Sequence, residues 1–129
     1  MPRCPCGLPD EFDACCGRLI AGAPAETAEQ LMRSRYTAYI KGAVDYLLKT
    51  TAAVSRGAID RAGLVAYCRT LRGVSLEIVE TVAGGPFDQR GVVVFVATLQ
   101  SAGSKVVQRE RSRFEVEDGR WVYVDGEVR

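Results

Sequence analysis

Four cysteines stand close together near the start of the sequence, as the pair Cys4 and Cys6 and the adjacent pair Cys15 and Cys16. A zinc ion held by thiolates takes four ligands in a tetrahedron, usually supplied as two close pairs separated by a loop. With sulfur at all four corners, no position remains for a reacting water molecule. The spacing therefore predicts a closed, structural zinc site, and the alternative is a disordered tail with four free cysteines.

The rest of the sequence restricts the chemistry that is available. The chain of 129 residues contains no histidine, which removes the commonest general base and excludes Ser-His-Asp, Cys-His and histidine-ligated metal chemistry. The fifth cysteine, Cys68, lies in an apolar stretch and is predicted to be a small buried hydrophobic residue. Any catalysis would depend on carboxylates, tyrosines, arginines or the metal.

Composition is that of one globular domain with a short appendage. The formal net charge of +1 gives no general support to nucleic-acid binding. No apolar run reaches the roughly 18 residues of a membrane span, and the polar N-terminus does not resemble a secretory signal. We therefore expect a cytoplasmic protein, and in a reducing cytoplasm clustered cysteines are more often metal ligands than disulfides.

The elements that must position these residues begin with helices. Residues 1–24 are expected to form the zinc knuckle and a linker. Thr27 is a suitable N-cap with Gln30 three positions later, the pattern of a capping box, and it opens a predicted helix over residues 27–49. A loop, a second helix and a glycine stop are then predicted at residues 50–56, residues 58–71 and Gly73. The second helix is expected to bury Ile59, Leu64, Tyr67, Cys68 and Leu71.

An arginine interrupts the apolar face of the long predicted helix. That face is formed at helical spacing by Leu31, Met32, Tyr36, Tyr39, Ile40, Ala43, Tyr46 and Leu47. Arg35 lies within it, and a buried arginine is costly unless it is paired. We expect Arg35 to meet a carboxylate or to line a polar cavity, unless its side chain extends past the core to solvent.

From Val74 onward the hydrophobic period changes from 3.6 to 2, which indicates strands. Four strands are predicted, at residues 74–82, 91–99, 106–117 and 121–125. Turns are expected between them at residues 84–86, 101–104 and 118–119. The first strand should bury Val74, Leu76, Ile78 and Val82. The strand at residues 91–99 is apolar on both faces, so it should be central.

Alternation along the third strand predicts a pocket. Phe114 and Val116 mark the even face as the core side, so Glu110 and Ser112 should also point toward the helices. Together with Arg35 they predict a cavity that is apolar at one end and polar at the other. A buried ion pair without a ligand would use the same residues, and both interpretations stay open. The odd face, with Arg109, Arg111 and Arg113, is expected to be a solvated face or a dimer surface rather than a phosphate-binding stripe.

Two resemblances follow from these motifs. Residues 4–7 with residues 15–17 resemble the SEC-C motif, a zinc-binding segment best known from the C-terminus of the SecA translocase. Residues 31–39, 110–114 and 121–126 are similar to the bacterial YchJ-type family of uncharacterised proteins. The resemblance implies that residues 25–129 adopt the cone-shaped nuclear-transport-factor-two-like α+β fold, in which helices pack into a curved antiparallel sheet.

The same resemblances imply possible roles and show two departures. In SecA the similar knuckle contacts a chaperone and the ribosome, so a protein partner is implied. The fold hosts isomerases, dehydratases and binding proteins alike. Many YchJ-type relatives carry a second SEC-C copy, whereas the sequence given ends at Arg129 without one. Relatives also tend to have a histidine after the first long helix, where this sequence has residues 50–54 without one.

Three functions are therefore predicted, in order of preference. The first is a cytoplasmic, non-catalytic module with a zinc knuckle for protein contact and a small-molecule pocket or homodimer surface. The second is an enzyme of the isomerase or dehydratase type, with Glu110 as acid or base and Arg35 and Tyr39 positioning an anionic substrate. The third is an RNA- or ribosome-associated protein. The pocket candidates are Arg35, Tyr39, Glu110 and Ser112.

Overall fold

A computed structural model describes residues 3–128 of the chain, with the helices first and the strands second. The helical elements are η1 (Phe12–Ala14), α1 (Cys16–Ile20), α2 (Ala28–Lys41), α3 (Val44–Lys49), α4 (Ala53–Arg56) and α5 (Arg61–Thr70). The strands are β1 (Leu71–Ala83), β2 (Arg90–Ser101), β3 (Ser104–Glu117) and β4 (Arg120–Val128). The α+β class is as predicted. Residues 1–2 of the predicted knuckle segment and residue 129 of the predicted second domain lie outside the described range.

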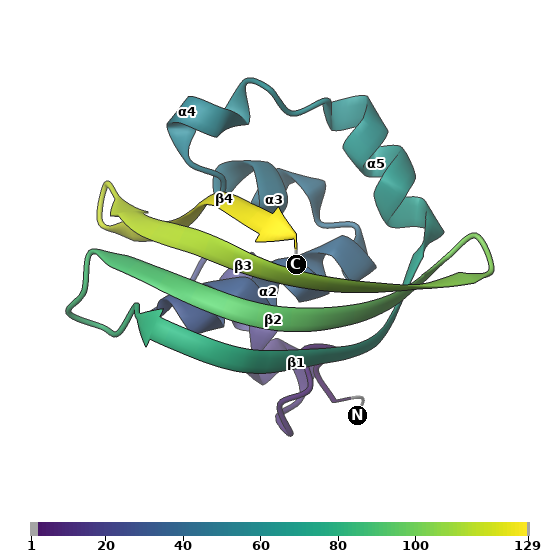
Figure 1. Ribbon diagram of the computed structural model, residues 1–129, viewed down its shortest axis with the longest axis horizontal. Helices are drawn as coiled ribbons and strands as arrows, with labels where there is room; N and C mark the ends of the chain where they lie inside the picture. Colours follow the sequence, from purple (N-terminus) through teal and green to yellow (C-terminus); the bar gives the residue numbers. More distant parts are fainter. Residues whose placement is uncertain (1–2, 129) are drawn as a thin grey trace.

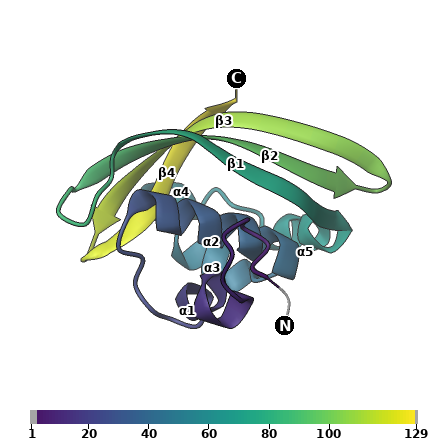
Figure 2. The ribbon, with the colours of Figure 1, turned by 90° about the horizontal axis from the view of Figure 1, so that it is seen from below.

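The four strands form one antiparallel sheet in the order β1-β2-β3-β4. The sheet is strongly curved and the helices all lie within its concave side (Figures 1 and 2). The prediction that residues 91–99 form a central strand is confirmed, because β2 pairs with β1 and β3. The hairpin turns at Ala102–Gly103 and Asp118–Gly119 have positive φ at both positions, as type I′ turns require.

The start of α2 follows the predicted capping pattern, whereas its end does not. Thr27 Oγ1 accepts a hydrogen bond from the main-chain N–H of Gln30 at 3.1 Å. Gln30 in turn accepts from the main-chain N–H of Glu26 at 2.9 Å. The single predicted helix over residues 27–49 is wrong, because Gly42 adopts φ 71° and ends α2 before α3 begins. Both helices bury apolar side chains toward the core, so the hydrophobic pattern continued across the break.

The predicted boundary between the second helix and the first strand is also corrected. Helix α5 ends at Thr70, and Leu71 is already extended and paired with Ser101. Gly73 therefore lies within β1 and is not a helix stop. A Cβ atom at Gly73 would overlap the side chain of Ile40, so the glycine allows β1 to approach α2. Residues 53–56, within the predicted loop, form the short helix α4.

Burial along β1 departs from strict alternation. Leu76 and Ile78 pack against the core as predicted, but Val74 and Val82 are exposed by 53% and 48%. Register irregularities between Gly73 and Ser75 and between Ile78 and Glu80 shift the faces of the strand, which also lies at the sheet edge.

On the predicted second helix, burial of Cys68 and Leu71 is confirmed, and Leu64 and Ile59 are half-buried. Tyr67, which was predicted to face inward, is 43% exposed. Cys68 is the buried residue of its helix α5. The helix lies at the edge of the helical layer, above the concave face of the sheet (Figure 1).

The alternation predicted for β3 is confirmed. Ser112 and Phe114 are fully buried on the concave face, Glu110 is half-buried there, and Arg109 and Arg113 are exposed on the opposite face. The concave face of β3 therefore presents a carboxylate and a hydroxyl to the helices. No helix within residues 3–128 is long and apolar enough to cross a membrane.

Candidate functional site

The four N-terminal cysteines come together into one cluster. Their Sγ atoms all lie within 4.8 Å of one another, and those of Cys6 and Cys15 are 3.7 Å apart. A tetrahedron with metal–sulfur distances of about 2.3 Å requires sulfur–sulfur separations of about 3.8 Å. Cys4, Cys6 and Cys16 are buried and Cys15 is half-buried. The cluster thus has the ligand number and the dimensions of a four-thiolate metal site.

Short-range contacts explain why this sequence gathers its cysteines. The main-chain N–H of Gly7 donates to the carbonyl of Cys4 at 3.2 Å, which closes a turn between the first pair and the loop. Gly7 adopts φ 95°, a conformation that disfavours other residues. The turn η1 and the first turn of α1 then deliver Cys15 and Cys16, and the ring of Phe12 packs beside them.

The electrostatics of the cluster favour a bound cation. A hydrogen bond from Cys16, opposed by burial, lowers the pKa of Cys6 to about 5. Burial and then Cys6 raise the pKa of Cys15 to about 12, and the hydrogen bond to Cys6 is the largest cause that raises the pKa of Cys16. One thiolate therefore opposes ionisation of its neighbours, and a divalent cation would remove this opposition. Four soft sulfur donors fit such an ion.

Side chains of helix α2 contact the cysteine cluster. Arg33 Nη1 donates to the main-chain carbonyl of Cys6 at 2.8 Å, and its Nε lies 3.0 Å from Oε2 of Glu29. Thr37 Oγ1 lies 3.8 Å from Sγ of Cys4. Leu76 of β1 also packs against the cluster. The N-terminal segment is thus docked on α2, where it is visible in purple in Figure 2.

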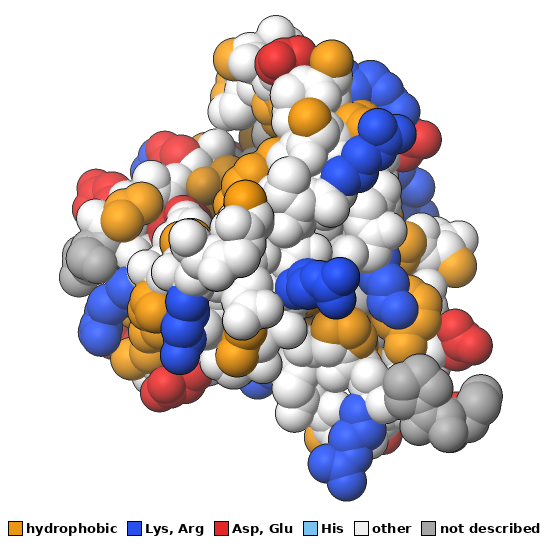
Figure 3. All heavy atoms as spheres, turned by 90° about the vertical axis from the view of Figure 1, so that its right-hand side faces the viewer, with side chains coloured by type: hydrophobic (Ala, Val, Ile, Leu, Met, Phe, Trp, Pro, Cys, Tyr) orange, Lys and Arg blue, Asp and Glu red, His pale blue; other side chains and the backbone are white. Residues whose placement is uncertain are grey.

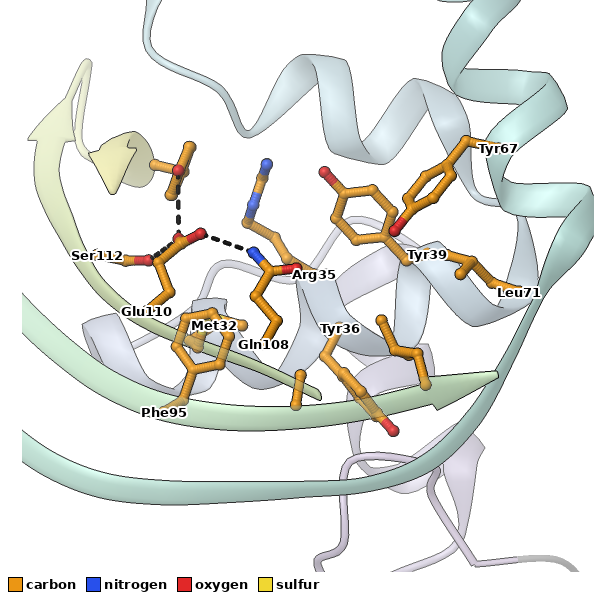
Figure 4. A pocket seen from close by; sticks show the side chains of 13 residues that line it. Met32, Arg35, Tyr36, Tyr39, Tyr67, Leu71, Phe95, Gln108, Glu110 and Ser112 are labelled. Carbon is orange, nitrogen blue, oxygen red and sulfur yellow. Dashed lines mark hydrogen bonds between the residues drawn. The ribbon is translucent and has the colours of Figure 1, made fainter. Parts of the chain in front are cut away.

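A pocket of about 250 Å³ lies on the concave side of the sheet, against the opposite face of α2. The structure brings the four candidates Arg35, Tyr39, Glu110 and Ser112 together around it (Figure 4). Most of its wall is apolar and aromatic, formed by Met32, Tyr36, Tyr67, Leu71, Phe95, Ala97 and Leu99. Gln108, Glu110 and Ser112 of β3 also line it, with Glu110 paired opposite Phe95, so the predicted division into an apolar end and a polar end is not seen.

Arg35 is buried without a carboxylate partner. Its side chain is only 6% exposed, so it does not extend to solvent. Its Nη1 donates to the carbonyl of Leu47 at 2.9 Å, to Thr50 Oγ1 at 2.7 Å and to Thr51 Oγ1 at 3.4 Å, at the end of α3. Within residues 3–128 it forms no ion pair, so the expected carboxylate partner is absent there and the polar-cavity alternative applies.

Aromatic rings complete the surroundings of Arg35. Its guanidinium carbon lies 4.8 Å from the centre of the Tyr123 ring. Burial lowers the pKa of Arg35, whereas Tyr39, Tyr123, Tyr46 and Glu110 raise it. A guanidinium remains protonated in proteins, so the pocket contains a fixed positive charge.

Glu110 has its own set of donors. Gln108 Nε2 donates to Oε1 at 3.0 Å, Ser112 Oγ donates to Oε2, and the hydroxyl of Tyr123 donates to Oε2 at 3.4 Å. Burial and the Glu110 carboxylate raise the pKa of Tyr123 to about 12, which keeps this phenol protonated as a donor. Figure 4 shows the Glu110 carboxylate joined to these groups and not to Arg35.

Three residues of this site were missed from the sequence. Gln108 shares the inward-facing parity of Glu110 and Ser112, so the alternation of β3 could have included it. Tyr123 and Gly126 lie in the segment that resembles YchJ-type proteins, but no pattern singled them out. A Cβ atom at Gly126 would overlap the Glu110 carboxylate, and this requirement appears only when β4 is paired with β3.

The outer face of the sheet shows charges of both signs. Arg113 forms an ion pair with Asp125 across β3 and β4, and Arg90 lies 3.7 Å from Glu115. On the side that carries α5 and the β2–β3 turn, Lys and Arg side chains are separated by uncharged surface (Figure 3). Among the described residues, that side of the molecule therefore shows no continuous basic patch (Figure 3).

Most of the chain matches a known protein family. Residues 27–126 match the family described as YchJ, middle NTF2-like domain. The chain belongs to the YchJ-like family. Its knuckle, which precedes the matched residues, has the cysteine pattern of a SEC-C motif.

Solved structures share this fold. The YchJ-like chain is 34% identical to a SEC-C motif containing protein from Rhodopseudomonas palustris, with a TM-score of 0.85 over 96% of each chain. A SEC-C motif containing protein from Psychrobacter arcticus is 24% identical, with a TM-score of 0.81 over 98% of this chain and 82% of that one. A putative calcium/calmodulin-dependent kinase II association domain from Exiguobacterium sibiricum shares the fold at 10% identity, TM-score 0.57, over 79% and 88% of the chains.

Proposed function

We propose that this protein is a small-molecule-binding protein whose N-terminal knuckle is stabilised by a structural zinc ion. The observation that supports binding is the pocket itself. It holds a buried guanidinium and a carboxylate that are not paired with each other, beside an aromatic wall. A core without a ligand would gain by joining such charges directly, because unpaired buried charges destabilise a fold. A buried ion pair with no ligand is thus the less suitable interpretation.

The zinc assignment is supported by the donor set. Four cysteine sulfurs at these separations suit zinc, and they leave no coordination position for a substrate or water. None of the five cysteines forms a disulfide, which suits the reducing cytoplasm, where we place the protein. The metal would order a segment that contains little apolar core of its own.

Ligand-observed and protein-observed NMR with a library of small amphipathic molecules tests the proposal. Binders should shift amide resonances of β2 and β3 that border the pocket. Ala97 is buried on the pocket wall, so Ala97→Leu should fill the space and weaken binding at least about tenfold. Thr98→Leu, which changes the next residue of β2 on the opposite face, is the matched control. Equal binding by the two variants would contradict a functional pocket.

An enzyme of the isomerase or dehydratase type is the second candidate. It is favoured by the Glu110 carboxylate, which borders the pocket without an ion-pair partner in residues 3–128 and could accept a proton. Molecules that bind can be incubated with the protein in D₂O and followed by NMR. Deuterium uptake with the wild type that is lost with Glu110→Gln would support this candidate. Retention of every proton would favour plain binding.

Protein contact by the knuckle is part of the same proposal. The metal ligands face inward, whereas the loop at residues 7–11 is exposed and fixed at both ends by the cluster. The SEC-C motif in the relatives' names motivates the expectation but does not identify a partner. A pull-down should recover the same proteins with the wild type and with Ala97→Leu, and lose them with Cys15→Ser. Equal recovery with Cys15→Ser would contradict this role.

A further inference from the structure

The guanidinium of Arg35 is bound by the protein on one side only. All its hydrogen bonds to residues 3–128 come from Nη1, which reaches the end of α3. Its Nε and Nη2 have no partner among these residues, although the side chain is only 6% exposed. Two cavities border the arginine, the main pocket and a second one of about 220 Å³ beneath the α4–α5 connection.

The two free nitrogens form a specific shape. Nε–H and one Nη2–H are parallel donors on the same edge of the planar guanidinium, and this fork matches the two oxygens of a carboxylate. The opposite edge is already used by the protein, so the orientation of the fork is fixed by α3. Two aromatic side chains, Tyr39 and Tyr123, border both cavities together with the arginine. The arrangement therefore resembles a preformed receptor for a planar anion.

Glu110 restricts which anion can enter. Its carboxylate borders the main pocket together with Arg35, and like charges within one site oppose each other. A phosphate dianion carries two negative charges and would be repelled by Glu110 more strongly than a carboxylate, which carries one. The remaining acceptor capacity of Glu110 suits a hydroxyl or amine donor on the ligand. The apolar part of the pocket wall, which includes Met32 and Leu99, and the volume of about 250 Å³ suit a ligand with a compact hydrocarbon or aromatic body.

We propose that the pocket binds a small monocarboxylate with an apolar body, whose carboxylate accepts hydrogen bonds from Nε and Nη2 of Arg35. Glu110 selects among such acids those that carry a hydrogen-bond donor. The inference rests on the proposed small-molecule function and names its ligand class. It assigns Arg35 as the binding residue and Glu110 as the residue that determines specificity.

Matched probes test the ligand class. Phenylacetate, phenylacetamide and phenethylamine share one aromatic body and differ in the head group. Binding is measured by ¹⁵N-resolved NMR titration of the full chain, with shifts at β2 and β3 pocket residues as the site criterion. Phenylacetate should bind at least about tenfold more tightly than the amide, because only a charged carboxylate makes the two charge-assisted bonds. Equal affinities, or carboxylate shifts confined to surface residues, would overturn the inference.

Two variants separate the roles of Arg35 and Glu110. Arg35→Lys keeps the positive charge but removes the fork, so phenylacetate should bind about tenfold more weakly. Glu110→Gln removes a negative charge from the pocket, so it should strengthen phenylacetate binding, and it decides the question if Arg35→Lys does not fold. Weaker phenylacetate binding by folded Glu110→Gln would contradict the assignment.

The outcomes also distinguish this inference from the function on which it rests. If the amide or the amine binds at the pocket and phenylacetate does not, the carboxylate assignment fails and the small-molecule function stands. If no probe of the set, and no member of the wider library, shifts pocket resonances, both fail. Shifts by phenylacetate that Ala97→Leu abolishes and Thr98→Leu preserves would support both.

Discussion

The side chain of Glu110 occupies the space that a side chain at Gly126 would need. Gly126 lies opposite Ser112 on the neighbouring strand, and a Cβ atom there would overlap Oε2 of Glu110. The glycine has no positive φ to explain it, so its role is to make room for the carboxylate. The position of Glu110 in the pocket is therefore fixed from β4 as well as by its three donors.

Gly126→Ala is expected to displace the flexible Glu110 side chain from its donors and to destabilise the fold by about 1 kcal/mol, the usual effect of losing a hydrogen bond. Chemical denaturation measures the change. Gly57→Ala is the control, because Gly57 has helical φ and ψ angles and no atom lies near its missing side chain. That control should be neutral or slightly stabilising. If both variants had the same stability, the packing of Glu110 over Gly126 would be unimportant.

The raised pKa of Tyr123 predicts that the protein loses stability at high pH. Its pKa is about 12 in the folded protein, against an ordinary value of 10.0 for a tyrosine. Between these values the unfolded chain has lost the proton that the folded chain still holds, so the free energy of unfolding falls as pH rises. This contribution is complete below pH 10 and is lost toward pH 12. Tyr123→Phe should flatten the stability profile in this window.

Spectroscopic titration provides a direct check on the same residue. The phenolate absorbance of the wild type minus that of Tyr123→Phe reports Tyr123 alone, provided that both proteins stay folded. The difference should rise well above pH 10. A midpoint at the ordinary tyrosine value would show that neither burial nor Glu110 acts on this hydroxyl.

Removal of the metal should destabilise the N-terminal segment. Native mass spectrometry should find about one zinc ion per chain, and Cys16→Ser should lose it because a four-ligand site tolerates no missing ligand easily. A strong chelator should lower the melting temperature of the wild type. Cys68→Ala is the matched control, since Cys68 is buried in the main core, away from the cluster. Full zinc content in Cys16→Ser would refute the four-thiolate site.

Arg33 is expected to hold the knuckle on α2. Arg33→Ala removes the charged hydrogen bond to the Cys6 carbonyl, with an expected loss of about 1–3 kcal/mol and faster zinc transfer to a chelator. Glu29→Gln is the control, because it weakens the ion pair with Arg33 and leaves the Cys6 bond in place. Identical transfer rates in Arg33→Ala and Glu29→Gln would show that this bond does not retain the metal.

Local signals in the sequence predicted the parts of the fold that depend on neighbours along the chain. Thr27 capped its helix, Asp118–Gly119 turned its hairpin, and the parity of β3 placed Glu110 and Ser112 on the concave face. The predictions that failed depend on other segments. The exposure of Val74 follows from a bulge in the β1–β2 pairing, and no period within β1 reveals it.

The partner of Arg35 was unpredictable for the same reason. A carboxylate was a reasonable expectation for a buried arginine, but the end of α3 supplies a carbonyl and two hydroxyls instead. That end exists at this place only because Gly42 breaks the predicted single helix in two. Because the end of α2 at Gly42 was not predicted, the hydrogen-bond acceptors of Arg35 could not be predicted either.

Helix α2 separates the pocket from the cysteine cluster, with Arg35 and Tyr39 on one side and Arg33 and Thr37 on the other. The protein is thus a three-layer stack of sheet, helix and knuckle, and the knuckle, from residue 3 onward, contains only the short helical elements η1 and α1. Leu19 from this layer is buried in the main core. Removal of residues 1–24 would take Leu19 out of the core and expose the side of α2 that carries Arg33 and Thr37, so we expect the remaining NTF2-like domain to be less stable than the full chain.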